Sequence, residues 1–190
     1  MAEKQRCPWC ETSDKMREYH DTFWGTPLHD DQELYAKLVL DLNQAGLSWN
    51  TILNKMDNFY AAFDGFEMAK VANYTEKDRE RLLHDAGIIR NRLKVNAAIV
   101  NAQAVLDVQQ EFGSFDAYLW GFVEGKPIVH GNKSEKDIKA SDELSDRVSK
   151  DMKKRGFKFV GTTIIYAYFQ AIGIINDHLT SCFRYQELVD

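Results

Sequence analysis

Apolar residues recur at intervals of three and four along most of this 190-residue chain, and this spacing constrains its fold more than any other feature. In the stretch after Asp30, for example, Leu34, Leu38 and Leu42 follow one another at four-residue intervals. That spacing is typical of a helix with one buried face. No alternation of apolar and polar residues is long enough to indicate a useful strand. The sequence therefore predicts an all-α fold.

Capping residues and glycines suggest where the helices begin and end. The first clear helix runs from about Asp30 to Gln44 and stops at Gly46. Ser48 can cap a helix over residues 49–63, and Thr75 with Asp78 resembles a capping box. A long helix is expected over residues 90–112. Its buried side is predicted to consist of Leu93, Ala97, Val100, Ala104 and Val108.

Residues 124–141 form the one long loop expected, and they mark a lobe boundary or a mobile flap. After it, two helices flank the hairpin sequence RGFKFVG, residues 155–161. No internal repeat or low-complexity tract interrupts this order.

Composition limits the class of protein. Hydrophobic residues make up 44% of the chain, which is ample for a core, and the formal net charge of −5 argues against a general polyanion binder. A local basic patch could still bind phosphates. No apolar run is long enough for a membrane span, and three cysteines fit a reducing compartment. We therefore expect a cytoplasmic protein without a membrane partner.

Four residues from the two ends of the chain make a metal-ligand set: Cys7, His20, His178 and Cys182. The last two are four residues apart, which places both on one face of a short helix and suits a tetrahedral zinc site. Alternatively, each is an ordinary buried cysteine or a surface histidine. Cys10 adds a second alternative, because Cys7 and Cys10 also resemble a redox pair or half of a zinc knuckle.

A carboxylate lies beside an apolar helix face and near several aromatic residues. Asp41 falls at the edge of the stripe formed by Leu34 and Leu38, where an unpaired charge would be costly. The nearby aromatic residues are Trp9, Tyr19, Trp24 and Trp49. Together they could form a pocket that stacks on a flat, cationic ligand. The alternative is that these aromatic residues belong to the core.

Positive charge gathers at the hairpin and at the start of the long helix. Thr162 and Thr163 begin a helix whose free N–H groups can hold a phosphate, and the preceding hairpin is basic. The hairpin cations are Lys153, Lys154, Arg155 and Lys158, and the second cluster is Arg90, Arg92 and Lys94. Basic clusters at helix ends can also be simple partners of the helix dipole.

Taken together, these segments resemble the bacterial 3-methyladenine DNA glycosylase I family of the helix-hairpin-helix superfamily. The likeness covers nearly the whole chain, through RCPW, YHDTFWGTP, QAGLSW, DAGIIRNRLK, KKRGFKFVGTTI and NDHLTSC in this order. It implies one glycosylase domain over residues 1–190. Within it, a lobe from residues 1–25 and 165–190 is joined by one structural zinc ion on Cys7, His20, His178 and Cys182. The hairpin element lies at about residues 142–173 in a central helical lobe.

The resemblance also implies an activity: a DNA repair hydrolase of base excision repair that removes 3-methyladenine from alkylated double-stranded DNA. It would be monofunctional and monomeric, leaving an abasic site. Asp41 would be the catalytic carboxylate and would line the base pocket with Trp9, Tyr19, Trp24 and Trp49. The implied DNA-binding residues are Gln44, Gly46, Leu47, Arg155, Gly156, Lys158, Gly161 and Thr162.

This chain departs from the family pattern at two pocket positions. The family usually has Glu where Asp41 stands, and a Tyr where Met16 stands. Both changes concern ligand recognition. They leave two alternatives: a member that binds damaged DNA without turnover, or one that releases another alkylated purine. Asp177 lies near the place of a catalytic aspartate in related glycosylases, but its neighbour His178 favours a supporting role.

Overall fold

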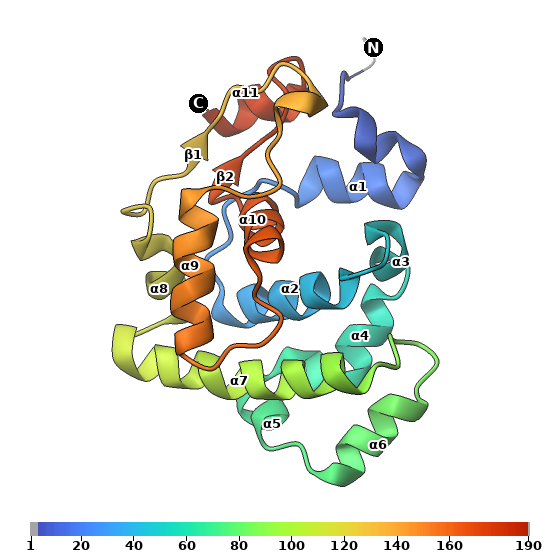
Figure 1. Cartoon of the computed structure of the whole chain (residues 1–190). Helices are drawn as coiled ribbons and strands as arrows, with labels where there is room; N and C mark the ends of the chain where they lie inside the picture. Colours follow the sequence, from blue (N-terminus) through green and yellow to red (C-terminus); the bar gives the residue numbers. More distant parts are fainter. Residues whose placement is uncertain (1–3, 190) are drawn as a thin grey trace.

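The computed structural model describes residues 4–189, and its architecture is helical (Figure 1). The α-helices are α1 (Asp14–Thr22), α2 (Asp31–Gln44), α3 (Trp49–Leu53), α4 (Met56–Ala62), α5 (Met68–Ala72), α6 (Glu76–His84), α7 (Arg92–Phe112), α8 (Phe115–Gly121), α9 (Glu143–Lys154), α10 (Thr162–Ala171) and α11 (Phe183–Val189). Short 3-10 helices are η1 (Pro8–Thr12), η2 (Asp64–Phe66) and η3 (Glu135–Asp137). None of the helices within residues 4–189 is both long and apolar enough to cross a membrane. The all-α prediction is confirmed in its main point.

Helix α2 lies at the centre, in contact with α3, α4, α7, α8 and α10 (Figure 1). The Asp30 side chain caps its first turn by accepting from the backbone N–H of Glu33, as expected of a short acidic side chain at this position. At the other end Gly46 adopts φ = +78°, which favours glycine and lets the chain turn away. Leu34 to Asn43 are all buried. The helix therefore crosses the core, and its charged residues need partners inside the protein.

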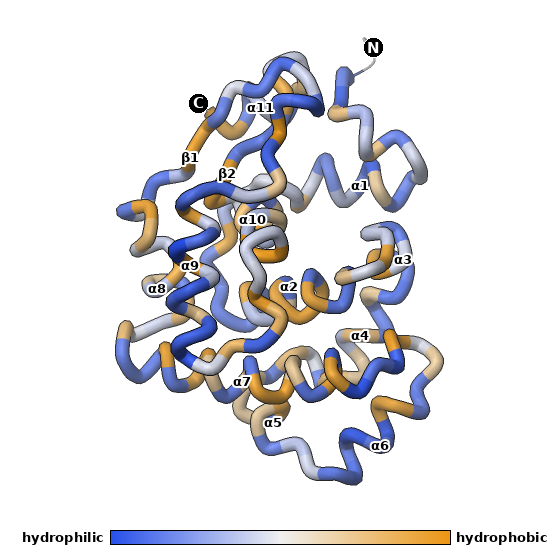
Figure 2. Tube along the Cα trace, in the orientation of Figure 1, coloured by the Kyte–Doolittle hydropathy of each residue, from blue (hydrophilic) through white to orange (hydrophobic). Residues whose placement is uncertain are grey.

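Helix α7 runs along one side of the molecule, and hydrophobic and hydrophilic residues alternate along it (Figure 2). Ala97, Ala104 and Val108 are buried as predicted. Leu93 and Val100, however, are 68% and 39% exposed, so the predicted stripe is wrong at these two positions. Helices α5 and α6 pack on α7, and the face of α7 that is buried differs from the predicted stripe. The buried face is broader than one stripe and also contains Val95, Ala98, Ile99, Ala102 and Val105.

Two other details differ from the expectation. The segment predicted as one helix over residues 49–63 is two helices, α3 and α4, because the backbone leaves helical geometry at Lys55 (φ −106°, ψ 2°). The Lys55 ammonium reaches the carbonyl of Ala86, which ties the break to the segment after α6. Within the long loop, β1 (Ile128–Val129) pairs in parallel with β2 (Ile175–Asn176). Each strand has only two residues, which is too short to leave an alternating pattern.

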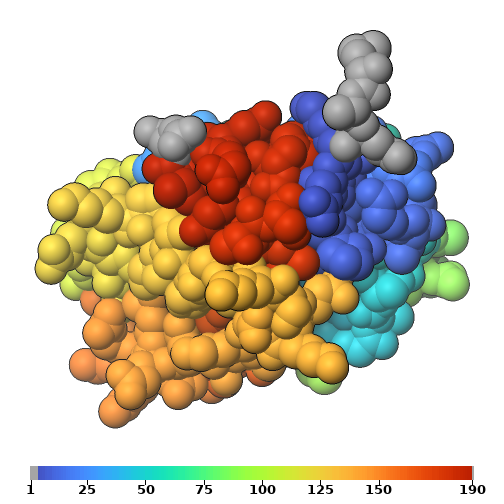
Figure 3. Space-filling model, turned by 90° about the horizontal axis from the view of Figure 1, so that it is seen from above, coloured from blue at the N-terminus to red at the C-terminus, as the bar shows by residue number. Residues whose placement is uncertain are grey.

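The two ends of the described chain lie side by side, as the neighbouring blue and red surfaces in Figure 3 show. A backbone bond joins Phe183 N to Gln5 O at 2.9 Å. The end of α10 also approaches residues 25–27 so closely that only a glycine fits at position 173. A Cβ there would come within 2.5 Å of Pro27 N. The N-terminal helices and the C-terminal segment therefore form one packed unit.

Helices α9 and α10 are joined by the predicted hairpin, residues 155–161, which rests on α7. The buried amide of Asn101 holds it: Oδ1 accepts from Lys158 N at 2.7 Å, and Nδ2 donates to Lys158 O at 3.0 Å. Ser149 Oγ donates to Val160 O at 2.6 Å from the other side. Hydrogen bonds from α7 and α9 therefore fix the conformation of the hairpin.

We expect Asn101→Ala to lower the free energy of unfolding by about 2 kcal/mol, because two backbone groups of the hairpin lose their partner. Denaturant unfolding measures this directly. Gln103→Ala is the control, since Gln103 is exposed on the same helix and bonds only Asp107. Equal stability of the two variants would show that Asn101 does not hold the hairpin.

Candidate active site and candidate metal centre

A cavity of about 250 Å³ opens between α1, α2, α3 and α10. It is smaller than the sites of about 300–1,000 Å³ that hold drug-sized ligands, so it suits a single heterocycle. All five residues predicted for the base pocket line it, together with Met16, whose side chain is buried in the wall. The lining includes Trp9, Met16, Tyr19, Trp24, Lys37, Asp41, Gln44, Trp49 and Gln170.

The aromatic rings of this pocket come from four short segments and pack against one another. Trp9 lies on η1, Tyr19 on α1, and Trp24 just after α1; Trp49 is the first residue of α3. The ring centroids of Trp9 and Trp24 are 5.1 Å apart, and those of Tyr19 and Trp49 are also 5.1 Å apart. The rings therefore pack as a small core and also line a cavity, so the two alternatives do not exclude each other.

Asp41 is buried on the inner face of α2, with 5% of its surface exposed. One carboxylate oxygen, Oδ1, accepts a hydrogen bond from the Lys37 ammonium. Within residues 4–189, the other oxygen, Oδ2, has no hydrogen-bond partner, and neither has the indole N–H of Trp49. Burial raises the pKa of Asp41 against the opposing effect of Lys37. The site thus contains an unpaired acceptor and an unpaired donor, as expected of a pocket that completes its hydrogen bonds with a ligand.

Lys37 is the residue of this site that the sequence reasoning missed. It is 4% exposed, and burial lowers its pKa while Asp41 raises it. The available signal was its position four residues before Asp41, the spacing at which helical side chains meet. Lys37 also lines a second cavity of about 620 Å³, which it shares with Tyr19 and Trp49 and whose other lining groups include Glu18, Glu33 and Asp57. Lys37 therefore lies in the wall between two cavities.

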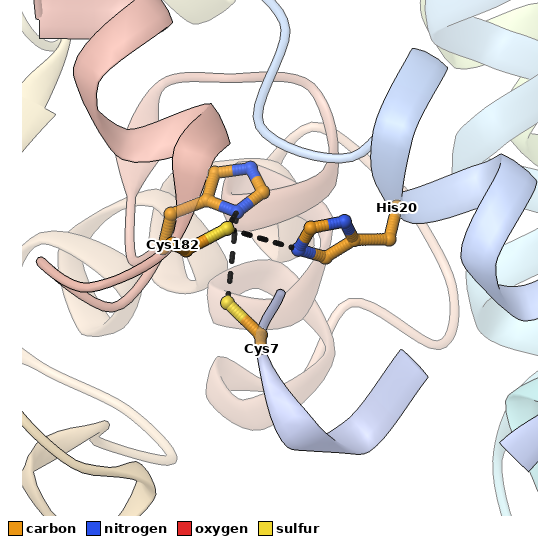
Figure 4. A group of neighbouring side chains, drawn as sticks. Cys7, His20 and Cys182 are labelled. Carbon is orange, nitrogen blue, oxygen red and sulfur yellow. Dashed lines mark hydrogen bonds between the residues drawn. The ribbon is translucent and has the colours of Figure 1, made fainter. Parts of the chain in front are cut away.

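The predicted metal ligands converge in the described chain. Cys7, His20, His178 and Cys182 are all buried, and their ligand atoms lie within 4.8 Å of one another. Figure 4 shows Cys7, His20 and Cys182 pointing to a common centre. The Cys182 Sγ lies 3.4 Å from His20 Nε2 and 3.6 Å from His178 Nδ1, and Cys7 Sγ lies 3.7 Å from His178 Nδ1. Ligands of tetrahedral zinc are separated by roughly 3.3–3.8 Å, so this set fits such an ion.

Further contacts orient these ligands. His20 Nδ1 lies 2.8 Å from Asp21 Oδ1, and His178 Nε2 lies 2.9 Å from the carbonyl of Trp24, so each ring has a partner on the side away from the centre. The neighbouring Cys7 thiol holds the pKa of the Cys182 thiol well below its usual value, and His178 and His20 lower it further. Cys10 lies outside the group and points to the Cys7 carbonyl at 3.1 Å.

One part of the metal prediction is wrong. His178 and Cys182 do not share a helix, because the chain leaves β2 at Asn176 and makes a turn before α11. The turn is closed by Cys182 N donating to Leu179 O at 2.7 Å. It brings the two side chains as close together as a helix would.

The loop that follows α2 contains Gln44, Gly46 and Leu47. Leu47 is 41% exposed at its tip, while Gln44 lines the smaller cavity. The ammonium of Lys94 holds this loop by donating to the carbonyls of Asn43 and Ala45, both at 2.7 Å. Lys94 is buried, so it does not belong to the exposed basic cluster that the sequence suggested.

The hairpin keeps only part of its predicted positive charge available. Arg155 donates to Asp151 at 2.7 Å and to Glu111 at 2.6 Å, and it lies over the ring of Phe112. Lys158 is exposed, and Gly156 takes φ = +93° at the turn. Gly161 precedes α10, and the Thr162 hydroxyl lies 2.8 Å from that of Ser145. A DNA contact by Arg155 would require it to leave two ion pairs.

Asp177 has the supporting role that its position suggested. Its carboxylate is fully buried and accepts from His130, Asn132, Tyr166 and Gln170 at 2.7–2.8 Å. His130 is exposed, yet its ring lies 2.7 Å from this carboxylate. Since Gln170 lines the smaller cavity, Asp177 fixes part of its wall from behind.

Comparison with known proteins agrees with this arrangement. Residues 9–185 match the family model of methyladenine glycosylase. The chain is 45% identical over 181 residues to DNA-3-methyladenine glycosylase 1 of Escherichia coli (strain K12), covering 95% of this chain and 97% of that protein. It is 39% identical over 177 residues to DNA-3-methyladenine glycosylase of Haemophilus influenzae, covering 93% and 96%.

Solved structures show the same fold. A crystal structure of 3-methyladenine DNA glycosylase I superposes with a TM-score of 0.91 at 45% identity, covering 94% of this chain and 98% of that one. The enzyme from Staphylococcus aureus, described as showing the structural basis of 3-methyladenine recognition, also gives 0.91, at 36% identity and coverage of 94% and 95%. The matched model, the identities and the superposition agree, and this chain belongs to the methyladenine glycosylase family.

Proposed function

We propose that this protein excises 3-methyladenine from alkylated DNA by hydrolysing the N-glycosidic bond. The observation that carries the proposal is the small aromatic cavity with a buried, half-paired carboxylate at its inner end. Its relatives are named for this reaction and are similar over nearly their whole length. The class of enzyme is thus a DNA glycosylase, a hydrolase of base excision repair.

Alkylation at N3 makes adenine a cation and weakens its bond to the sugar, so the base leaves without first being protonated. The enzyme can then select its substrate by binding the positively charged base more tightly than a neutral base. The flipped nucleotide would stack on Trp49 and Tyr19, with Trp9 and Trp24 closing the other side. Asp41 Oδ2, which has no partner in the described chain, would accept from the edge of the base. Water would then attack the sugar at an oxocarbenium-like centre that the carboxylate stabilises.

The DNA contacts are assigned to two loops. Leu47, exposed at the tip of the loop after α2, would fill the gap left by the flipped base, with Gln44 and Gly46 shaping that loop. The hairpin residues Lys158, Gly156 and Gly161, with Thr162 at the first turn of α10, would hold a phosphate. Arg155 would contact DNA only after its guanidinium leaves Asp151 and Glu111. We propose that the protein acts as a cytoplasmic monomer.

We also propose that the four-residue centre holds one zinc ion. Zinc with four protein ligands has no open position for substrate, so it would be structural and would take no part in the reaction. In this arrangement residues 1–25 and 165–190 form one lobe. Helix α9, the hairpin and α10 form the helix-hairpin-helix element at about residues 142–173.

A pocket retuned to another alkylated purine is the second candidate. It is favoured by the shorter carboxylate of Asp41, by Met16, and by the presence of Lys37 beside the acid. A binding module without turnover would keep the zinc centre and the hairpin but release no base.

Incubation with methylated DNA and chromatography of the released bases decides among these functions. We expect 3-methyladenine from the wild-type protein and a loss of at least about tenfold in kcat/KM for Asp41→Asn, since the carboxylate charge acts on the cationic base. Asp107→Asn is the control because that aspartate is exposed on α7. An unchanged rate for Asp41→Asn would refute its role, and release of a different base would support retuning.

The abasic product should remain uncleaved. Borohydride treatment of the protein with abasic duplex is expected to trap no covalent adduct, because Lys37, the buried lysine of the pocket, is engaged by Asp41. A trapped adduct that disappears in the Lys37→Met variant would show a lyase step instead.

Metal analysis tests the zinc assignment. Protein purified without added zinc should contain about one zinc ion per chain, and Cys182→Ser should lose it and melt more than about 10 °C lower. Cys10→Ser should keep the metal, because Cys10 lies outside the ligand group. Well-folded wild-type protein without metal would contradict the assignment.

A further inference from the structure

Lys37 occupies the place in the aromatic pocket that a cationic base is proposed to take. Its Nζ lies 4.2 Å from the ring centroid of Trp49 and 6.0 Å from that of Tyr19. The same ammonium pairs with Oδ1 of Asp41. A positive charge above an aromatic face and beside a carboxylate satisfies the same groups as a cationic heterocycle would. The protein without substrate therefore already holds a cation in its pocket.

This pair changes what the pocket can select. Asp41 and Lys37 together have no net charge, so a positively charged base gains the full attraction of Asp41 only after the ammonium moves away. A neutral base cannot replace that ammonium, because it would leave the carboxylate buried and without a counter-ion. Discrimination against normal bases is then stronger than an open carboxylate would give.

The structure also contains a second carboxylate that can receive the displaced ammonium. Lys37 lines the larger cavity as well as the smaller one, and Glu33 lies four residues before it on α2, just as Asp41 lies four residues after it. Glutamate placed four residues before a lysine is a favourable helical pair. The long, flexible lysine stem lets its ammonium turn from one carboxylate to the other without moving the helix.

We propose that Lys37 is a specificity-determining residue, the resident counter-ion of Asp41 that a base must displace toward Glu33 in order to enter the pocket. This inference rests on the proposed function. In the absence of substrate the ammonium neutralises the buried acid and bonds one of its two oxygens. With a methylated base bound, the base takes over that role and Lys37 pairs with Glu33 in the neighbouring cavity.

Steady-state kinetics of 3-methyladenine release tests this inference. Lys37→Met removes the competing charge at similar side-chain length. The KM for 3-methyladenine release should therefore fall by at least about tenfold. Free adenine, a neutral base, should inhibit this variant at concentrations at least about tenfold lower than those that inhibit the wild type. Lys70→Met is the matched control, because Lys70 pairs with Asp64 at an exposed site away from the pocket.

Glu33→Gln provides a second measurement if Lys37→Met does not fold. It removes the charge that would receive the displaced ammonium, so KM should rise by about threefold or more. Thermal unfolding confirms that each variant is folded. An unchanged or higher KM for folded Lys37→Met, or an unchanged KM for Glu33→Gln, overturns the role of Lys37 while leaving the glycosylase intact. If the wild-type protein releases no 3-methyladenine, the proposed function itself fails, and this inference fails with it.

Discussion

The convergence of Cys7, His20, His178 and Cys182 is the interaction on which the candidate active site depends. It joins segments more than 150 residues apart in sequence and fixes the N-terminal helices against the end of the chain. Trp9 lies two residues after one of these ligands, and Tyr19 immediately precedes another. The rings of the pocket are thus placed by the same contacts that close the fold. Without this closure, η1 and α1 would keep a small cluster of buried side chains, the hydrogen bond from Ser13 to Asn50 and the backbone bond from Phe183 to Gln5.

The second constraint is electrostatic. Helix α2 crosses the core, yet it places a lysine and an aspartate one turn apart on its inner face. Replacing such a pair with apolar side chains often leaves a protein as stable or more stable, so stability alone does not explain its presence. The proposed function of the pocket accounts for it. An aspartate is also one methylene shorter than a glutamate, which leaves space for the ammonium between the acid and the ring of Trp49.

The sequence predicted the helical class, the main capping residues, the four converging Cys and His side chains and, apart from Lys37, the aromatic and acidic lining of the smaller cavity. These features depend on local spacing and on chemically distinctive side chains. It failed where tertiary contacts decide. Leu93 and Val100 match a helical stripe but face solvent, since α5 and α6 cover a different side of α7. Lys37 reads as an ordinary surface residue until its neighbours are known. Similarly, one of the two ion pairs of Arg155 is with Glu111, which is 44 positions away, and no local pattern shows it.

Helix α7 would set the distance between the two proposed DNA contacts. Lys94 holds the loop with Leu47, and Asn101 holds the hairpin with Lys158. These two side chains are separated by two helical turns, about 10 Å along the axis, and lie on the same side of one rigid rod. In the proposed complex with DNA, this single element would therefore set the distance between the flipped base and the phosphate bound by the hairpin. The proposed complex would then have a fixed span along the duplex, and the DNA would have to bend or unstack to match it.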